Sequence, residues 1–127
     1  MLYKRGLMAR TVLIIEDDKA IADTLEEALK LLGFNVLVAG NGKDALDQLE
    51  RVAKPDLILL DLMMPVMDGW EFHRRKLQLD TISSIPVILI TADGNSEVKA
   101  KAIGAQGHLT KPFEFVDLIR ITAPFAG

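Results

Sequence analysis

Four short apolar runs constrain the fold of this chain more than any other feature of its sequence. Each run holds three or four residues, and none shows the alternation of apolar and polar positions that is typical of a strand with one face in water. The runs cover residues 12–15, 36–38, 57–60 and 87–90. We therefore predict parallel strands that are buried on both faces.

The segments between these runs have the spacing of helices. Apolar residues recur at helical intervals over 21–32, and Gly33 follows as a stop signal. The same pattern returns over 45–53, before Pro55. Three further helices are predicted over 70–79, 95–103 and 114–122, with a fifth strand near 108–109. This alternation predicts an α/β fold in three layers: a doubly wound, five-stranded parallel sheet covered by helices on both faces.

Length and composition limit the classes of function. The chain has 127 residues, half of them apolar, which suits one domain with one core. Its net charge is -3 and it has no basic block, so direct nucleic-acid binding is not expected. The absence of Cys excludes disulfides and thiolate zinc sites, and favours the cytoplasm. No apolar run approaches the roughly 20 residues that span a bilayer, so no membrane insertion is expected.

Polar side chains follow the apolar runs, where an open parallel sheet binds its ligands. The second run differs from the others, since it is followed by Ala39 and Gly40, which carry neither a charge nor a polar side chain. This asymmetry favours the strand order 2-1-3-4-5, in which the second strand lies at an edge. The polar residues are Glu16, Asp17 and Asp18 after the first run, Asp61 after the third, Thr91 after the fourth, and Thr110 and Lys111 after the fifth strand.

Several carboxylates in one crevice repel one another unless some are protonated or a cation lies among them. Oxygen ligands without Cys or His favour a hard ion, and a few carboxylates with room for water fit Mg²⁺. An aspartate can also act as a nucleophile toward phosphorus when the charge on the phosphoryl group is neutralised. Lys111 could supply that positive charge, and Thr91 could donate a hydrogen bond. The sequence therefore predicts a site that accepts a phosphoryl group.

Four motifs now indicate a family. The segments VLIIEDD, LILLDLMMPVMDG, PVILITA and LTKPF occur in this order, and over about residues 10–122 the chain resembles the receiver domain of bacterial response regulators, in its single-domain form. The resemblance implies a flavodoxin-like fold. It also implies a receiver domain over 10–123, an N-terminal extension over 1–9, a C-terminal tail over 124–127 and no output domain.

The resemblance assigns a role to each polar residue. Asp61 is implied to be the phosphoacceptor. Asp17, Asp61 and the backbone carbonyl of Met63 would bind Mg²⁺ directly, and Glu16 would bind it through a water. Lys111, Thr91 and His108 would couple phosphorylation to conformation, although His108 stands where the family usually has Tyr or Phe. A cis peptide bond is implied between Lys111 and Pro112, and Met63 and Asp93 occupy positions that tune the lifetime of the acylphosphate.

Three further residues receive structural interpretations. Asp18 is expected to cap the first helix and to bind no metal. Trp70 is expected to pack against other side chains, and His73 to be a solvated helix residue.

The function implied is a signalling switch and not a metabolic enzyme. Asp61 would take a phosphoryl group from a histidine kinase or a histidine phosphotransfer protein, and the changed conformation would alter binding to a downstream protein target. Mg²⁺-dependent autophosphorylation, autodephosphorylation and a dimer formed on phosphorylation belong to the same expectation. Two alternatives remain: a docking module that works without phosphorylation, and a Mg²⁺-dependent phosphohydrolase. Against the latter, Met63 stands where haloacid-dehalogenase-like phosphatases place an acid.

Overall fold

A computed structural model describes residues 9–51, 54–64, 66–92 and 94–126. The predicted extension over 1–9 therefore lies almost wholly outside the described residues, as does Asp93. The predicted helix over 45–53 also runs into residues 52 and 53, which are not described.

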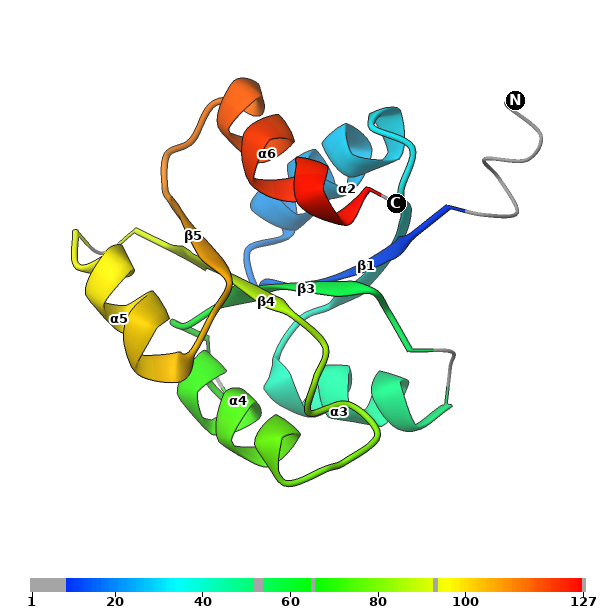
Figure 1. The fold of residues 1–127 in the computed structure, drawn as a ribbon, viewed down its shortest axis with the longest axis vertical. Helices are drawn as coiled ribbons and strands as arrows, with labels where there is room; N and C mark the ends of the chain where they lie inside the picture. Colours follow the sequence, from blue (N-terminus) through cyan, green and yellow to red (C-terminus); the bar gives the residue numbers. More distant parts are fainter. Residues whose placement is uncertain (1–8, 52–53, 65, 93, 127) are drawn as a thin grey trace.

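The five predicted strands form one parallel sheet (Figure 1). Its order is β2-β1-β3-β4-β5, which confirms the predicted topology. In the register of the sheet, Ile15 lies opposite Leu60, and Asp61 lies opposite Ile90. The strands are β1 (Thr11–Ile15), β2 (Asn35–Ala39), β3 (Leu57–Asp61), β4 (Val87–Thr91) and β5 (Gly107–Thr110).

Within the described residues, five α-helices connect and follow these strands, and a short 3-10 helix comes after the last of them. They are α2 (Lys19–Leu31), α3 (Gly42–Arg51), α4 (Gly69–Leu77), α5 (Ser96–Ile103), α6 (Phe115–Thr122) and the 3-10 helix η1 (Ala123–Phe125). As expected, Asp18 caps α2, because its Oδ1 accepts a hydrogen bond from the Ile21 N–H at 3.2 Å. Helix α3 begins three residues before the predicted apolar pattern, since the Asn41 side chain accepts from the Asp44 N–H at 2.9 Å.

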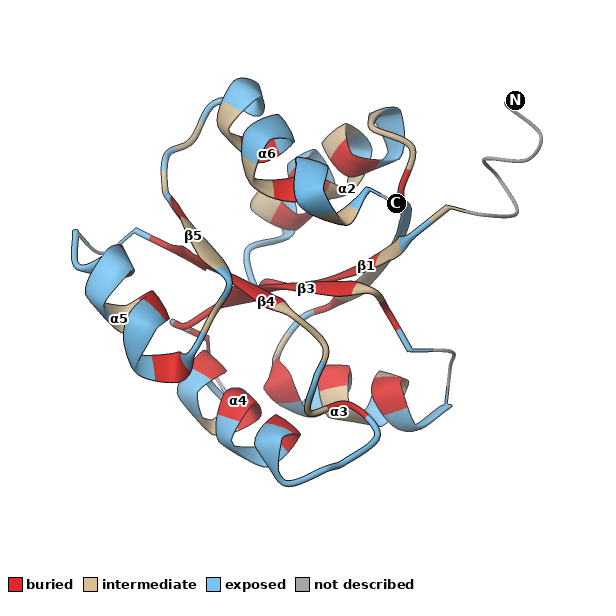
Figure 2. Cartoon of the chain, viewed as in Figure 1, coloured by how far each residue is buried: buried red, intermediate tan, exposed pale blue. Residues whose placement is uncertain are grey.

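Helices cover both faces of the sheet. On one face, Leu25 and Leu29 of α2 and Leu118 of α6 pack against alternate residues of β1, β3, β4 and β5. On the other face, Leu49 of α3 and Phe72 of α4 pack against the remaining residues of the central strands, and α5 adds its own cluster beside β4. Figure 2 shows the buried residues on the strands and on the inner sides of the helices. Burial on both faces explains why the apolar runs do not alternate.

One expectation about α4 is wrong, and one stays a prediction. Trp70 is 41% exposed, so only part of its side chain can pack against its neighbours. His73 is buried at 7% exposure, since it projects from the inner side of the helix toward α5. None of the described helices has the length and apolar character needed to cross a membrane.

Candidate functional site

Three carboxylates gather at the carboxyl ends of β1 and β3. One oxygen from each of Glu16, Asp17 and Asp61 can be chosen so that all three lie within 4.8 Å of one another. Glu16 and Asp61 are buried, whereas Asp17 is exposed. Neighbouring parallel strands produce this arrangement, because β1 and β3 are paired in register and both strands end at the same edge of the sheet.

Asp61 is held at the very end of β3 and is only 3% exposed. Its Oδ1 accepts a hydrogen bond from the Met63 N–H at 3.2 Å. Behind it, Gly69 starts α4 in close contact with the strand end, since its N–H donates to the Leu62 carbonyl at 3.0 Å. A Cβ on Gly69 would lie 2.6 Å from the Asp61 carbonyl oxygen, so only glycine allows this approach.

Lys111 supplies the positive charge of the site. Its Nζ lies 2.6 Å from Glu16 Oε1 and 3.6 Å from Asp61 Oδ2. Burial alone would lower the pKa of Lys111, but its contacts with Glu16 and Asp61 outweigh burial and raise that pKa. The ammonium is therefore charged at neutral pH and bridges the two buried acids. The peptide bond to Pro112 is cis, as predicted.

Glu16 differs from a surface glutamate in its proton affinity. Burial raises the pKa of its carboxyl, and the nearby Asp61 acts in the same direction. Lys111 and the Asp18 N–H act in the opposite direction, because both stabilise the charged form. Glu16 therefore holds a proton more tightly than an exposed glutamate does.

Thr91 is brought to the same place from β4. It is the last residue of that strand, is 1% exposed, and its carbonyl accepts a hydrogen bond from the Lys111 N–H at 2.8 Å. A hollow of about 320 Å³ unites the polar residues predicted to follow the strands, except Thr110. Its lining consists of Glu16, Asp17, Asp18, Ile21, Asp61, Met63, Thr91, Ala92 and Lys111.

His108 is the one predicted switch residue that lies outside this hollow. On β5 it pairs with Leu89 of β4, and Leu89 lies two positions before Thr91 on that strand. His108 and Thr91 therefore project from the same face of the sheet. It lines a separate hollow of about 190 Å³ beside Asp117 and Arg120 of α6. His108 is therefore close in register to Thr91 but is separated from the acidic site.

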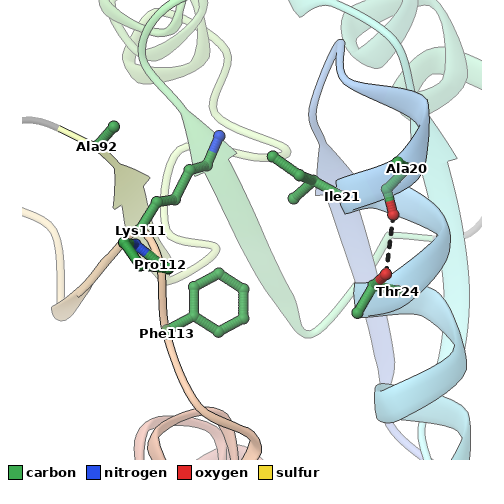
Figure 3. A pocket seen from close by; sticks show the side chains of 7 residues that line it. All are labelled: Ala20, Ile21, Thr24, Ala92, Lys111, Pro112 and Phe113. Carbon is green, nitrogen blue, oxygen red and sulfur yellow. Dashed lines mark hydrogen bonds between the residues drawn. The ribbon is translucent and has the colours of Figure 1, made fainter.

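A third hollow, of about 430 Å³, adjoins the acidic site and is mostly apolar. Figure 3 shows Ile21 on α2 and the Phe113 ring on its two sides. Ile21 and Lys111 also line the acidic hollow. Sequence reasoning missed this groove, because Phe113 and Ile21 look like ordinary core residues. It also missed Gly69, although a glycine directly after Asp68, which caps α4, is a usable signal of close packing.

The carboxylates fit a hard divalent cation. Glu16, Asp17 and Asp61 offer only oxygen ligands, and the Lys111 ammonium is already shared between Glu16 and Asp61. An exposed Asp17 leaves one side of the cluster open to water, which suits the partly hydrated coordination of Mg²⁺.

Comparison with known proteins gives a consistent result. Residues 12–123 match the family described as response regulator receiver domain. The chain is 35% identical over 116 residues to the probable transcriptional regulator ycf29 of Porphyra purpurea, covering 90% of this chain and 55% of that protein. This chain thus spans about half the length of that curated relative.

Two solved structures are also similar. The chemotaxis protein CheY4 of Vibrio cholerae is 30% identical, with a TM-score of 0.83, over 91% of this chain and 98% of that one. The receiver domain of sensor histidine kinase PA1611 from Pseudomonas aeruginosa is 28% identical, with a TM-score of 0.82, over 93% and 98% of the two chains. Its crystal structure has a magnesium ion coordinated in the active site cleft.

Proposed function

Because this chain belongs to the response regulator receiver domain family, a regulatory family of two-component signalling, we propose that it is a switch controlled by phosphorylation of Asp61. One observation carries this proposal: a buried carboxylate at a strand end faces an open acidic hollow and has a lysine ammonium 3.6 Å away. Asp61 would supply the nucleophilic oxygen, and Lys111 would counter the charge of the incoming phosphoryl group.

In the proposed reaction an Asp61 carboxylate oxygen attacks the phosphorus of a phosphohistidine. The new O–P bond forms as the P–N bond breaks, and the imidazole leaves with the electron pair and takes up a proton. Asp17, Asp61 and the Met63 carbonyl would hold Mg²⁺, with Glu16 acting through a water. When bound, this ion neutralises charge on the phosphoryl oxygens.

Lys111 and Thr91 would convert the chemical change into a conformational one. In this structure the shortest contact of the Lys111 ammonium is with Glu16, at 2.6 Å. A phosphoryl group on Asp61 would compete for that ammonium, and the Thr91 hydroxyl would donate to a phosphoryl oxygen. The Lys111 N–H donates a hydrogen bond to the Thr91 carbonyl, so both movements would reach β5 and its His108.

The phosphodonor would be a histidine kinase or a histidine phosphotransfer protein. A protein donor needs a surface on which to dock next to Asp61, and the apolar groove between α2 and Phe113 adjoins the acidic hollow through shared Ile21 and Lys111. Docking there would bring a partner's histidine to the open side of the carboxylates. The phosphorylated chain would then bind a downstream protein target. Phosphorylated chains would also form a dimer.

Intact mass after incubation with acetyl phosphate tests the proposal. We expect the gain of one phosphoryl group with Mg²⁺, no gain without the metal, and no gain in Asp61→Asn. A docking module that works without phosphorylation would show no adduct under any of these conditions.

A phosphohydrolase would consume the donor catalytically without a lasting adduct. The residue two positions after Asp61 argues against this, since the exposed Met63 side chain cannot protonate a leaving group.

A further inference from the structure

A cavity of about 220 Å³ lies away from the acidic site, where the C-terminal ends of α4 and α5 meet the loop that leads into β4. It is lined by His73, Lys76, Leu77, Ser83, Ser84, Ile85, Val87, Ile103, Gly104 and Gln106. None of these residues belongs to the proposed phosphorylation site.

Lys76 is the first unusual feature of this cavity. It is only 2% exposed and ranks among the largest fully buried side chains. Its Nζ donates to the Ser83 carbonyl at 2.9 Å, and no acidic partner for it occurs among the described residues. Burial lowers the pKa of Lys76, because removing the ammonium from water disfavours its charged form.

His73 is the second unusual feature and lies one turn earlier on α4. It is 7% exposed, and neither of its ring nitrogens makes a regular hydrogen bond within the described part of the chain. Burial lowers the pKa of His73, and the charge of Lys76 adds to this effect. The backbone of Ile103 offsets part of the shift. A buried imidazole without a partner costs free energy, which a ligand could recover.

Among the described residues that line the cavity, none is acidic. The loop before β4 contributes Ser83 and Ser84, α5 and its cap contribute Ile103 and Gly104, and the segment before β5 contributes Gln106. All of these are neutral. The cavity therefore combines two basic groups and two hydroxyl-bearing residues with no negative charge, and buried cations are normally paired.

We propose that this cavity binds a small oxyanion, with Lys76 and His73 as its charged donors. The Lys76 ammonium has two N–H groups beyond the one given to Ser83, and a protonated His73 adds another. Charge-assisted hydrogen bonds to oxygen are the strongest that such donors make. Binding should take up a proton at His73, so affinity should rise as the pH falls from about 8 to about 6.

Titration of the full chain with inorganic phosphate, followed by amide chemical shifts, tests this proposal. The titration is done without divalent cations, so that the acidic site stays repulsive toward anions. We expect saturable shifts at Ser84, Gly104 and Gln106, with tighter binding at about pH 6 than at about pH 8. A parallel titration with acetate separates phosphate from carboxylate as the preferred oxyanion.

Two variants and a control make the result decisive. Lys76→Met keeps the length of the side chain, and we expect it to fold and to bind phosphate about tenfold more weakly or worse. His73→Leu should remove the pH dependence of binding. Lys101→Met removes the same charge from the exposed side of α5 and should bind as the wild type does. Shifts confined to residues near Lys111, or equal binding by Lys76→Met and wild type, would overturn the proposal.

Discussion

At the scale of single residues, Asp17 differs from the other two acids of the cluster because it is exposed and has no ion pair with Lys111. Its charge repels two buried carboxylates. Asp17→Asn should therefore raise the free energy of unfolding without metal by about 1 kcal/mol, and should remove most of the stabilisation by Mg²⁺. Urea unfolding with and without Mg²⁺ measures both effects.

The exposed acid Asp47 on α3 provides the matched control. Asp47→Asn should change neither quantity. An Asp17→Asn variant that loses stability in the absence of metal would contradict the repulsive cluster.

Val66 carries the clearest backbone strain. Its φ is 69°, which β-branched residues rarely adopt, and its side chain is 81% exposed and packs little. Val66→Asn should stabilise the protein by about 1 kcal/mol, because asparagine tolerates this conformation and no packing is lost. Thermal unfolding checks this, and a drop in midpoint would show that Val66 makes a favourable contact.

His73 makes stability depend on pH. The folded state lowers the pKa of His73, so the unfolded chain binds more protons just below the ordinary histidine pKa of about 6.5. In buffer free of oxyanions, stability should therefore fall as the pH drops through this range. Chemical denaturation of wild type and His73→Leu at several pH values measures the difference, and parallel curves for the two proteins would refute it.

At the scale of elements, α4 is fixed against β3 by a glycine contact. A methyl group at Gly69 would lie 2.7 Å from the Leu62 Cα and closer still to the Asp61 carbonyl. Gly69→Ala should cost about 1–3 kcal/mol of stability and slow phosphorylation, because the end of β3 must move. Unfolding curves and the rate of adduct formation with acetyl phosphate measure these effects.

Gly94 is a suitable control, since a Cβ there would meet nothing within 4 Å. Gly94→Ala should leave both quantities close to those of the wild type. If Gly69→Ala behaves like Gly94→Ala, the close contact between α4 and β3 is not needed for the geometry of Asp61.

Most elements were predictable from the sequence because each strand is buried on both faces and each helix on one. Boundaries were less predictable where polar residues make them. Asn41 starts α3 in a turn without apolar signal, and α4 ends at Leu77, two residues before the predicted end. His73 was misassigned because a histidine in a charged helix indicates exposure unless its position relative to the core is known.

At the scale of the whole molecule, the strand order brings distant residues together. Placing β1 between β2 and β3 aligns Glu16 with Asp61, and β4 and β5 then bring Thr91 and Lys111 to the same edge. This convergence follows from topology and was predictable. The preference of Lys111 for Glu16 over Asp61, the apolar groove and the basic cavity depend on side-chain packing, which the order of residues does not specify.

The most direct test of this account is to locate the phosphoryl group. After incubation with acetyl phosphate and Mg²⁺, borohydride reduction converts an aspartyl phosphate to homoserine, and peptide mass spectrometry identifies its position. We predict homoserine at position 61 alone. Modification at Asp17 or Asp18, or at a side chain that borohydride does not reduce, would contradict the assignment of Asp61 as the phosphoacceptor.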